Sequence, residues 1–360
     1  MGETAGPATL ADMGGWPAVL RRLVGGDALT AGEARAAMTD VLDGAATPSQ
    51  LAAFIVALRM KGETVEEMTG LVGAMLDAAE TVPLHRNDAV DTCGTGGAAS
   101  RRTSAFNVST IASMVIAGAG GAVCKHGNRK ASSTSGSADL LEALGVVIDL
   151  DGPGVAACVA ETGMGFCFAP RFHPAMRHAV PTRREIGIPT VFNFLGPLAN
   201  PARLRRQVLG VSDARMGERM AGVLQARGCE RALVVHGHDG LDELTTTGPS
   251  TVFDVDGGEV RTYVVEPGEL GVPVAAPDDL KGGDVATNAE LARRILAGEP
   301  GAHRELVVLN AAAGLVAGGA AADLVAGVAA ARAALDEGRA ASVLHALVET
   351  SQRVARDRSG

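Results

Sequence analysis

Residues 122–144 read AVCKHGNRKASSTSGSADLLEAL, and this stretch decides the fold class. The short apolar run Ala122–Cys124 predicts a strand, and the polar run Lys125–Asp139 predicts a loop. The apolar residues Leu140–Leu144 then predict the start of a helix. A strand, a polar loop and a helix in this order are typical of an α/β protein.

The polar loop has the composition of a segment that binds a polyanion. Its glycines allow backbone N–H groups to approach phosphate, its hydroxyl side chains add donors, and Lys125 and Arg129 supply positive charge. The helix that follows would direct its N-terminus toward the same anion. The local composition also leaves open a polar surface loop without a ligand.

The bulk composition indicates a helix-rich α/β protein with an aliphatic core. The chain has 360 residues, of which 47% are hydrophobic and only 3% are aromatic. Its net charge of −9 argues against a general binder of nucleic acid or of membrane surfaces. A phosphate site in such a protein must therefore be a local basic patch.

Cysteine usage and apolar runs predict a soluble, cytoplasmic protein. The five cysteines lack metal or redox spacing, which is typical of reduced core residues. Met1–Met13 lacks the pattern of a secretion signal. The apolar run Val307–Ala322 is interrupted by Asn310 and by glycines, so we do not expect a membrane span. The cysteines are Cys93, Cys124, Cys158, Cys167 and Cys229.

Residues 16–82 predict a bundle of four helices. Capping-box signatures mark helix starts at Thr30, Thr47 and Thr64. Gly44 and Gly62 provide the stops between these helices. A bundle this small needs a partner surface to bury its apolar stripes.

After Pro83 the pattern changes to short apolar runs that alternate with helix-like runs, which indicates a parallel sheet. The alternating segment Val252–Val265 contains Asp256-Gly257-Gly258 and predicts a hairpin. Ligands of such sheets bind at the carboxyl ends of the strands. The predicted strands are Ala89–Cys93, Ala122–Cys124, Val146–Leu150, Gly165–Phe168, Val208–Val211 and Ala232–Val235.

Two further motifs fit an anion site at these strand ends. Gly94-Thr95-Gly96-Gly97 directly follows a predicted strand, and a glycine turn there exposes backbone amides. Asn107-Val108-Ser109-Thr110 precedes an apolar helical run. Asn107 or Ser109 would cap this helix, and the helix start would equally suit a diphosphate.

Two charged motifs complete the candidate site. Asp242 and Glu243 follow the predicted strand Arg231–His236, and such carboxylates are either solvated or hold Mg²⁺ together with phosphate oxygens. Arg183 presents a guanidinium fork that suits a carboxylate, and the alternative is that this segment only forms a surface ion pair, Arg184 with Glu185 or its neighbours. Since no nucleophile or acid–base pair stands out, we expect catalysis by positioning and electrostatics.

Taken together, these motifs resemble the anthranilate phosphoribosyltransferase family of tryptophan biosynthesis. The Lys-His-Gly-Asn-Arg run and the Asn-x-Leu-Gly-Pro-Leu-x-Asn-Pro run are highly specific, and the resemblance covers almost the whole chain. The matching segments occur in family order: 94–97, 107–110, 125–139, 172–176, Arg183, 192–201 and 240–243.

The resemblance implies the fold of nucleoside phosphorylases and phosphoribosyltransferases. In this fold, residues 1–84 form a small helical domain, completed by helices from about 175–200, which mediates a homodimer. Residues 85–360 form an α/β domain with a mainly parallel central sheet. The implied reaction transfers the phosphoribosyl group of phosphoribosyl pyrophosphate (PRPP) to the amine of anthranilate, with one or two Mg²⁺ ions. The products are N-(5-phosphoribosyl)anthranilate and pyrophosphate.

The family's functional residues carry over to matching positions. Lys125 and Arg183 would act electrostatically, with no acid or base. Gly94, Asn128 and Arg183 would contact anthranilate. The metal ligands would be Ser109, Asp242 and Glu243. The implied PRPP contacts are Gly94, Gly97, Ala98, Asn107, Val108, Ser109, Thr110, Lys125, His126, Gly127, Asn128, Arg129, Lys130, Ala131, Ser132, Ser133 and Ser137.

The chain departs from the family pattern after the glycine turn. Ala98 stands where the family normally has an aspartate, and the segment 98–106 is longer than usual and adds Arg101 and Arg102. Two alternatives therefore stay open: a diverged phosphoribosyltransferase with another aromatic acceptor, and a paralogue that binds PRPP or nucleic acid without catalysis. A third alternative is a pyrimidine nucleoside phosphorylase. It is disfavoured because that family lacks the Lys-His-Gly-Asn-Arg run.

Overall fold

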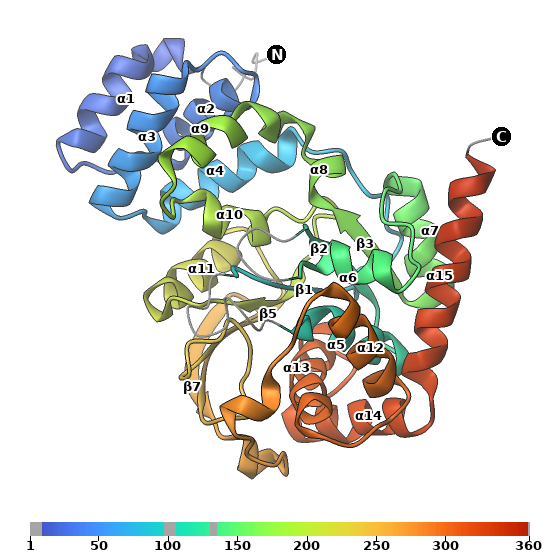
Figure 1. Ribbon diagram of the computed structural model, residues 1–360. Coiled ribbons are helices and arrows are strands. Elements are labelled where there is room, and N and C mark those ends of the chain that lie inside the picture. Colours follow the sequence, from blue (N-terminus) through green and yellow to red (C-terminus); the bar gives the residue numbers. More distant parts are fainter. Residues whose placement is uncertain (1–8, 97–105, 130–134, 359–360) are drawn as a thin grey trace, which may run out of the picture. The chain divides into compact units, whose positions relative to one another are not determined.

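The computed structural model describes residues 9–96, 106–129 and 135–358, and it divides the chain into two compact units (Figure 1). The helical unit combines Met1–Glu80 with Phe172–Ala199. The larger unit combines Thr81–Arg171 with Asn200–Gly360. Each unit is therefore assembled from two stretches of sequence.

The helical unit begins with the predicted run of four helices, three of whose starts were predicted from local signals. Thr30, Thr47 and Thr64 each form a complete capping box, so these three predictions are confirmed. From the later segment, α9 packs on α3 and α10 packs on α4. The elements are η1 (Ala11–Met13), α1 (Gly15–Val24), α2 (Ala31–Leu42), α3 (Pro48–Lys61), α4 (Val65–Asp77), η3 (Pro174–His178), α9 (Val180–Ile186) and α10 (Phe192–Leu198).

The core of the helical unit depends on close helix contacts. Trp16 and Phe54 meet edge to face with ring centroids 5.5 Å apart, and Phe54 is fully buried. A Cβ at Gly70 would lie 2.1 Å from the Ala31 carbonyl oxygen. The contact between α2 and α4 therefore requires a glycine at this position.

The larger unit contains a five-stranded sheet in the order β1-β4-β5-β6-β7 and a separate pair, β2-β3. The pairs β1-β4, β4-β5 and β2-β3 are parallel, which confirms the expected parallel arrangement, and β6 and β7 form the predicted hairpin. A parallel bridge between Val90 and Val123 links the two sheets. The strands are β1 (Asp91–Gly94), β2 (Val123–Gly127), β3 (Met164–Phe168), β4 (Arg206–Gly210), β5 (Arg231–Gly237), β6 (Ser250–Asp256) and β7 (Glu259–Val265).

Helices surround these strands. Figure 1 shows the C-terminal helices α13 to α15 near α5, and α13 contacts α5, β4 and β5, whereas α11 packs against β5 and β6. The helices of this unit are α5 (Val108–Gly118), α6 (Ser137–Ala143), α7 (Gly152–Thr162), α11 (Ala214–Ala226), η4 (Pro267–Leu270), η5 (Pro277–Leu280), α12 (Val285–Leu296), α13 (Ala302–Gly318), α14 (Leu324–Asp336) and α15 (Arg339–Asp357), and α8 (Ala169–Phe172) ends at the unit boundary.

One predicted strand is wrong. Val146–Leu150 buries alternate side chains, but it joins no sheet. The amide of Val147 instead donates to Ser351 Oγ on α15, at 3.1 Å. A side chain from a distant helix therefore replaces the neighbouring strand as hydrogen-bond partner.

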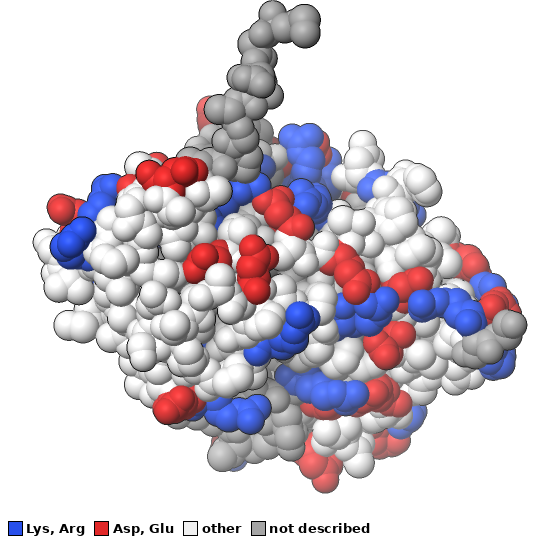
Figure 2. All heavy atoms as spheres, turned by 90° about the horizontal axis from the view of Figure 1, so that it is seen from above, with Lys and Arg blue, Asp and Glu red and all other residues white. Residues whose placement is uncertain are grey.

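The surface and the helices agree with the bulk composition. Figure 2 shows acidic and basic side chains interspersed over the face that it presents. None of the helices among the described residues combines the length and apolar character needed to cross a bilayer.

Candidate active site

The candidate site lies where β1, β4 and β5 end, as expected for parallel strands. The turn after β1 is joined to β4, because the Thr95 amide donates to the Gly210 carbonyl oxygen at 2.9 Å. The Ser212 hydroxyl donates to the Gly96 carbonyl oxygen at 2.8 Å. Gly96 adopts a φ of 67°, which favours glycine.

Asp242 packs directly against this turn. One of its carboxylate oxygens, Oδ2, accepts from the Gly96 amide at 2.8 Å. A Cβ at Gly94 would lie 2.2 Å from the same oxygen, and a Cβ at Gly210 would lie 1.6 Å from the Asp242 carbonyl oxygen. Glycine is therefore required at both strand ends for the 240–243 loop to approach. Sequence analysis missed Gly210, because nothing in its local pattern marks this approach.

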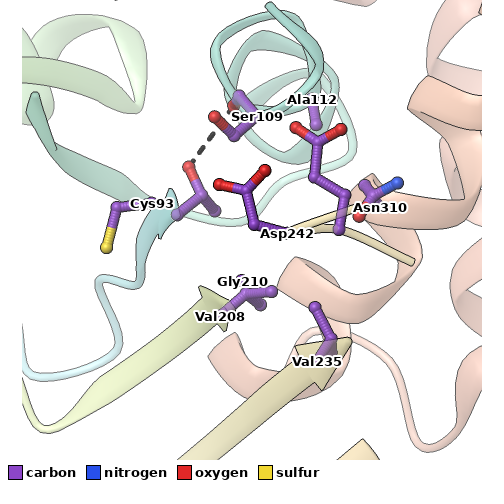
Figure 3. Close-up of a pocket in the computed structure, with 10 residues that line it drawn as sticks. Cys93, Ser109, Ala112, Val208, Gly210, Val235, Asp242 and Asn310 are labelled. Carbon is purple, nitrogen blue, oxygen red and sulfur yellow. Dashed lines mark hydrogen bonds between the residues drawn. The ribbon is translucent and has the colours of Figure 1, made fainter. Parts of the chain in front are cut away.

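A pocket in the larger unit gathers several candidate residues (Figure 3). In Figure 3 Ser109 and Asp242 face the same space, and Glu243 also lines the pocket. Two carboxylates and a hydroxyl form an oxygen donor set, which fits Mg²⁺. The lining residues are Thr92, Cys93, Ser109, Ala112, Val208, Gly210, Val235, Asp242, Glu243 and Asn310.

Within the described part of the chain, no group of three or more His, Cys, Asp or Glu side chains forms a ready metal cage.

The prediction that residues 125–139 form a single loop is wrong at Lys125. It belongs to β2, and its side chain is only 1% exposed. Its ammonium donates to the Thr92 carbonyl oxygen and to Ser109 Oγ, the latter at 3.2 Å. Burial lowers the pKa of Lys125, and the nearby Asp91 carboxylate opposes that shift. Lys125 therefore supplies a buried charge beside the pocket.

Asp91 is a residue that sequence analysis missed. It is 1% exposed at the start of β1, and its Oδ1 accepts from the His126 amide at 3.0 Å. Burial raises the pKa of this carboxyl, whereas Lys125 acts in the opposite direction. The opposite charges of Asp91 and Lys125 thus compensate each other inside the sheet.

The segments around 107 and 135 meet beside the pocket. Asn107 Nδ2 donates to the Ser135 carbonyl oxygen, and Ser135 Oγ donates to Asn107 Oδ1, both at 3.0 Å. The expected side-chain cap of α5 is wrong, since Asn107 makes no capping bond and Ser109 lies inside the helix. The Asn107 side chain instead joins two candidate PRPP segments.

Arg129 and Asn128 begin the loop proper. The Arg129 guanidinium pairs with Asp139 and Glu142 and lies 5.4 Å from the centroid of the Phe168 ring. In this structure its charge is thus balanced by two carboxylates of the protein. The Asn128 carbonyl oxygen accepts from the Ala138 amide at 3.2 Å.

The remaining candidates are distributed as follows. Val108, Thr110, His126, Gly127 and Ser137 lie in α5, β2 and α6 of the larger unit. Gly97, Ala98, Lys130, Ala131, Ser132 and Ser133 lie outside the described residues.

Arg183 belongs to the helical unit, on α9. Its guanidinium stacks 4.8 Å from the centroid of Phe192, and burial lowers its pKa. The ring holds the planar fork in a defined orientation, which suits recognition of a carboxylate.

Comparisons with known proteins agree with this geometry. Residues 86–341 match the glycosyl transferase family α/β domain, and residues 17–79 match the helical bundle domain of the same family. The anthranilate phosphoribosyltransferase of Salinispora arenicola is 50% identical over 347 residues, which span 94% of this chain and 97% of the relative. The chain belongs to the anthranilate phosphoribosyltransferase family.

Solved structures of this family share the fold. The Thermus thermophilus anthranilate phosphoribosyltransferase is 42% identical, with a TM-score of 0.87 over 93% of this chain and 99% of that chain. The Saccharomyces cerevisiae enzyme in complex with PRPP and Mg is 25% identical, with a TM-score of 0.85 over 94% of this chain and 98% of that one. The expected fold, a helical domain joined to a larger α/β domain, is confirmed.

Proposed function

We propose that this protein transfers the phosphoribosyl group of PRPP to the amine of anthranilate, in tryptophan biosynthesis. The observation that carries the proposal is the pocket shared by Ser109, Asp242 and Glu243, with the ammonium of Lys125 at its edge, in a chain of this family. The products are N-(5-phosphoribosyl)anthranilate and pyrophosphate.

The chain supplies groups that bind the phosphates and the ribose of PRPP. The turn Gly94–Gly97, the start of α5 and the segment 125–137 hold its phosphates and ribose. Ser109, Asp242 and Glu243 provide oxygen ligands for one or two Mg²⁺ ions. When bound, this metal neutralises charge on the departing pyrophosphate.

The chemistry needs charge stabilisation more than proton transfer. The aromatic amine of the acceptor is neutral at pH 7 and attacks without prior deprotonation. As the C1–O bond breaks, negative charge grows on the pyrophosphate, and Lys125 with the backbone amides of the turn stabilises it. The amine proton leaves to water after the new C–N bond has formed.

In this proposal Arg183, Asn128 and Gly94 are the residues that contact anthranilate. The Arg183 guanidinium pairs with the anthranilate carboxylate through two parallel hydrogen bonds and thereby aims the amine at C1. The stacking of Arg183 on Phe192 supports this role, because it fixes the plane of the fork.

We further propose that the protein acts in the cytoplasm as a homodimer formed through the helical unit. All five cysteines are free thiols, which suits a reducing compartment. Met60 on α3 is 84% exposed and Val24 on α1 is 80% exposed, so this unit offers apolar side chains to a partner.

A fluorescence assay tests the activity. The protein is mixed with PRPP, Mg²⁺ and anthranilate, and the loss of anthranilate fluorescence is followed over time. Turnover that needs all three components supports the proposal. Binding of PRPP without turnover would instead favour a diverged acceptor or a non-catalytic paralogue.

A further inference from the structure

Asn310 is a buried polar residue in the otherwise apolar stretch 306–318 of α13. It lies in α13, it is only 6% exposed, and its neighbours from Leu306 to Ala317 are all buried. Burial of a carboxamide costs free energy unless its donors and acceptor are paired. The contacts of Asn310 therefore indicate what the residue does.

The carboxamide of Asn310 holds one residue of the 240–244 loop by both backbone groups. Its Oδ1 accepts from the Leu244 amide at 3.0 Å, and its Nδ2 donates to the Leu244 carbonyl oxygen at 2.9 Å. Nδ2 also donates to the Leu306 carbonyl oxygen at 2.9 Å, one turn earlier in α13. This third bond fixes the carboxamide itself, so both the position and the orientation of Leu244 are determined.

The loop is also held at its other end. The Gly237 amide donates to the Leu241 carbonyl oxygen at 2.9 Å, and the Leu241 amide donates to Asp239 Oδ1 at 3.2 Å. Asp242 and Glu243 lie between these two attachments. Asn310 lines the same pocket as both carboxylates, as Figure 3 shows for Asp242.

We propose that Asn310 is a positioning residue, which fixes the Asp242 and Glu243 carboxylates for the Mg²⁺ that accompanies PRPP. It acts through the backbone of Leu244 and does not contact the ion. The inference rests on the proposed function, because that function assigns the metal to these carboxylates. It adds a residue that the motifs of the site did not include.

The test compares Asn310→Leu with a matched control, Thr162→Val. Asn310→Leu keeps the side-chain size but removes all three hydrogen bonds. Thr162 has the same kind of role elsewhere: it is buried on α7, and its hydroxyl bonds to both backbone groups of Met164, at 3.0 and 3.2 Å. Met164 begins β3 in the β2-β3 pair, whereas the site lies at the ends of β1, β4 and β5 in the five-stranded sheet.

Two measurements distinguish an effect on the metal site from a general loss of protein stability. Calorimetry gives the affinity for PRPP as a function of Mg²⁺ concentration, and electron paramagnetic resonance follows Mn²⁺ as a probe of the metal site. For Asn310→Leu we expect the Mg²⁺ concentration at half-saturation to rise by about tenfold or more. Thr162→Val should lower the melting temperature and leave this value unchanged.

Other outcomes overturn the inference. Asn310 has only a structural role if PRPP binding requires the same Mg²⁺ concentration in Asn310→Leu as in the unmodified protein. The same conclusion follows if Thr162→Val raises the required Mg²⁺ concentration as much as Asn310→Leu does. If the unmodified protein binds PRPP without regard to Mg²⁺, the metal assignment of the proposed function fails as well. Should Asn310→Leu not fold, Asn310→Asp keeps the acceptor for Leu244 but loses both donors, and the same rise is expected.

Discussion

At the scale of single residues, Lys125 combines a structural role with a proposed catalytic one. Its ammonium is buried beside Asp91 and touches Ser109 at the pocket. A buried charge without compensation is costly, so removal of Lys125 leaves Asp91 unfavourable in the core. The two roles can nevertheless be separated by experiment.

We predict that Lys125→Met lowers the free energy of unfolding by about 3 kcal/mol. It should also reduce kcat/KM by about 100-fold or more, since charge stabilisation of the leaving group is lost. The double variant Lys125→Met/Asp91→Asn should recover stability, because the uncompensated carboxylate is gone, but not activity. Urea unfolding and the fluorescence assay measure the two effects. Recovery of activity together with stability would argue for a purely structural Lys125.

Arg183 carries a second prediction at this scale. Arg183→Ala should raise the anthranilate KM by about 10- to 100-fold, the value of a lost charge-assisted pair, and change the PRPP KM far less. The adjacent and exposed Arg184→Ala is the control and should affect neither constant. Equal effects of Arg183→Ala on both substrates would remove Arg183 from the acceptor site.

At the scale of elements, the approach of the 240–243 loop to β1 and β4 depends on glycine. Gly210→Ala would place a Cβ 1.6 Å from the Asp242 carbonyl oxygen, so this loop must shift. Because a displacement of about 1 Å can cost 100-fold in rate, we expect a loss of that order in kcat/KM. Gly268→Ala is the control, since its Cβ would meet nothing within 4 Å. Steady-state kinetics that do not distinguish the two variants would contradict this account.

Elements encoded by local signals could be predicted from the sequence. The capping boxes at Thr30, Thr47 and Thr64 need only four consecutive residues each, and the turn at Gly257 and Gly258 needs only positive φ angles. These interactions form within one stretch of chain, so the pattern contains all the information required.

Features that depend on distant residues could not be predicted. Val146–Leu150 is a short apolar run like those of the strands, but the Val147 amide donates to Ser351, 204 positions away in the sequence. Motifs identified Lys125, Ser109 and Asp242, yet Asp91, Gly210 and Asn310 were missed as site residues. Each of these three acts through a contact made only after the chain has folded.

At the scale of the whole molecule, the proposed homodimer rests on exposed apolar side chains of the helical unit. Met60 and Val24 belong to α3 and α1, which pack on each other, and both are at least 80% exposed.

We therefore predict that the unmodified protein sediments as a dimer and that Met60→Lys shifts it to monomer in analytical ultracentrifugation. A buried, unpaired ammonium at the interface would cost several kcal/mol of association free energy, roughly 3 to 5 by analogy with broken buried pairs. Val264→Lys on β7 is the control: this valine is 54% exposed but lies in the larger unit, so the dimer should persist. If Met60→Lys stays dimeric while Val264→Lys dissociates, the interface belongs to the hairpin and not to the helical unit.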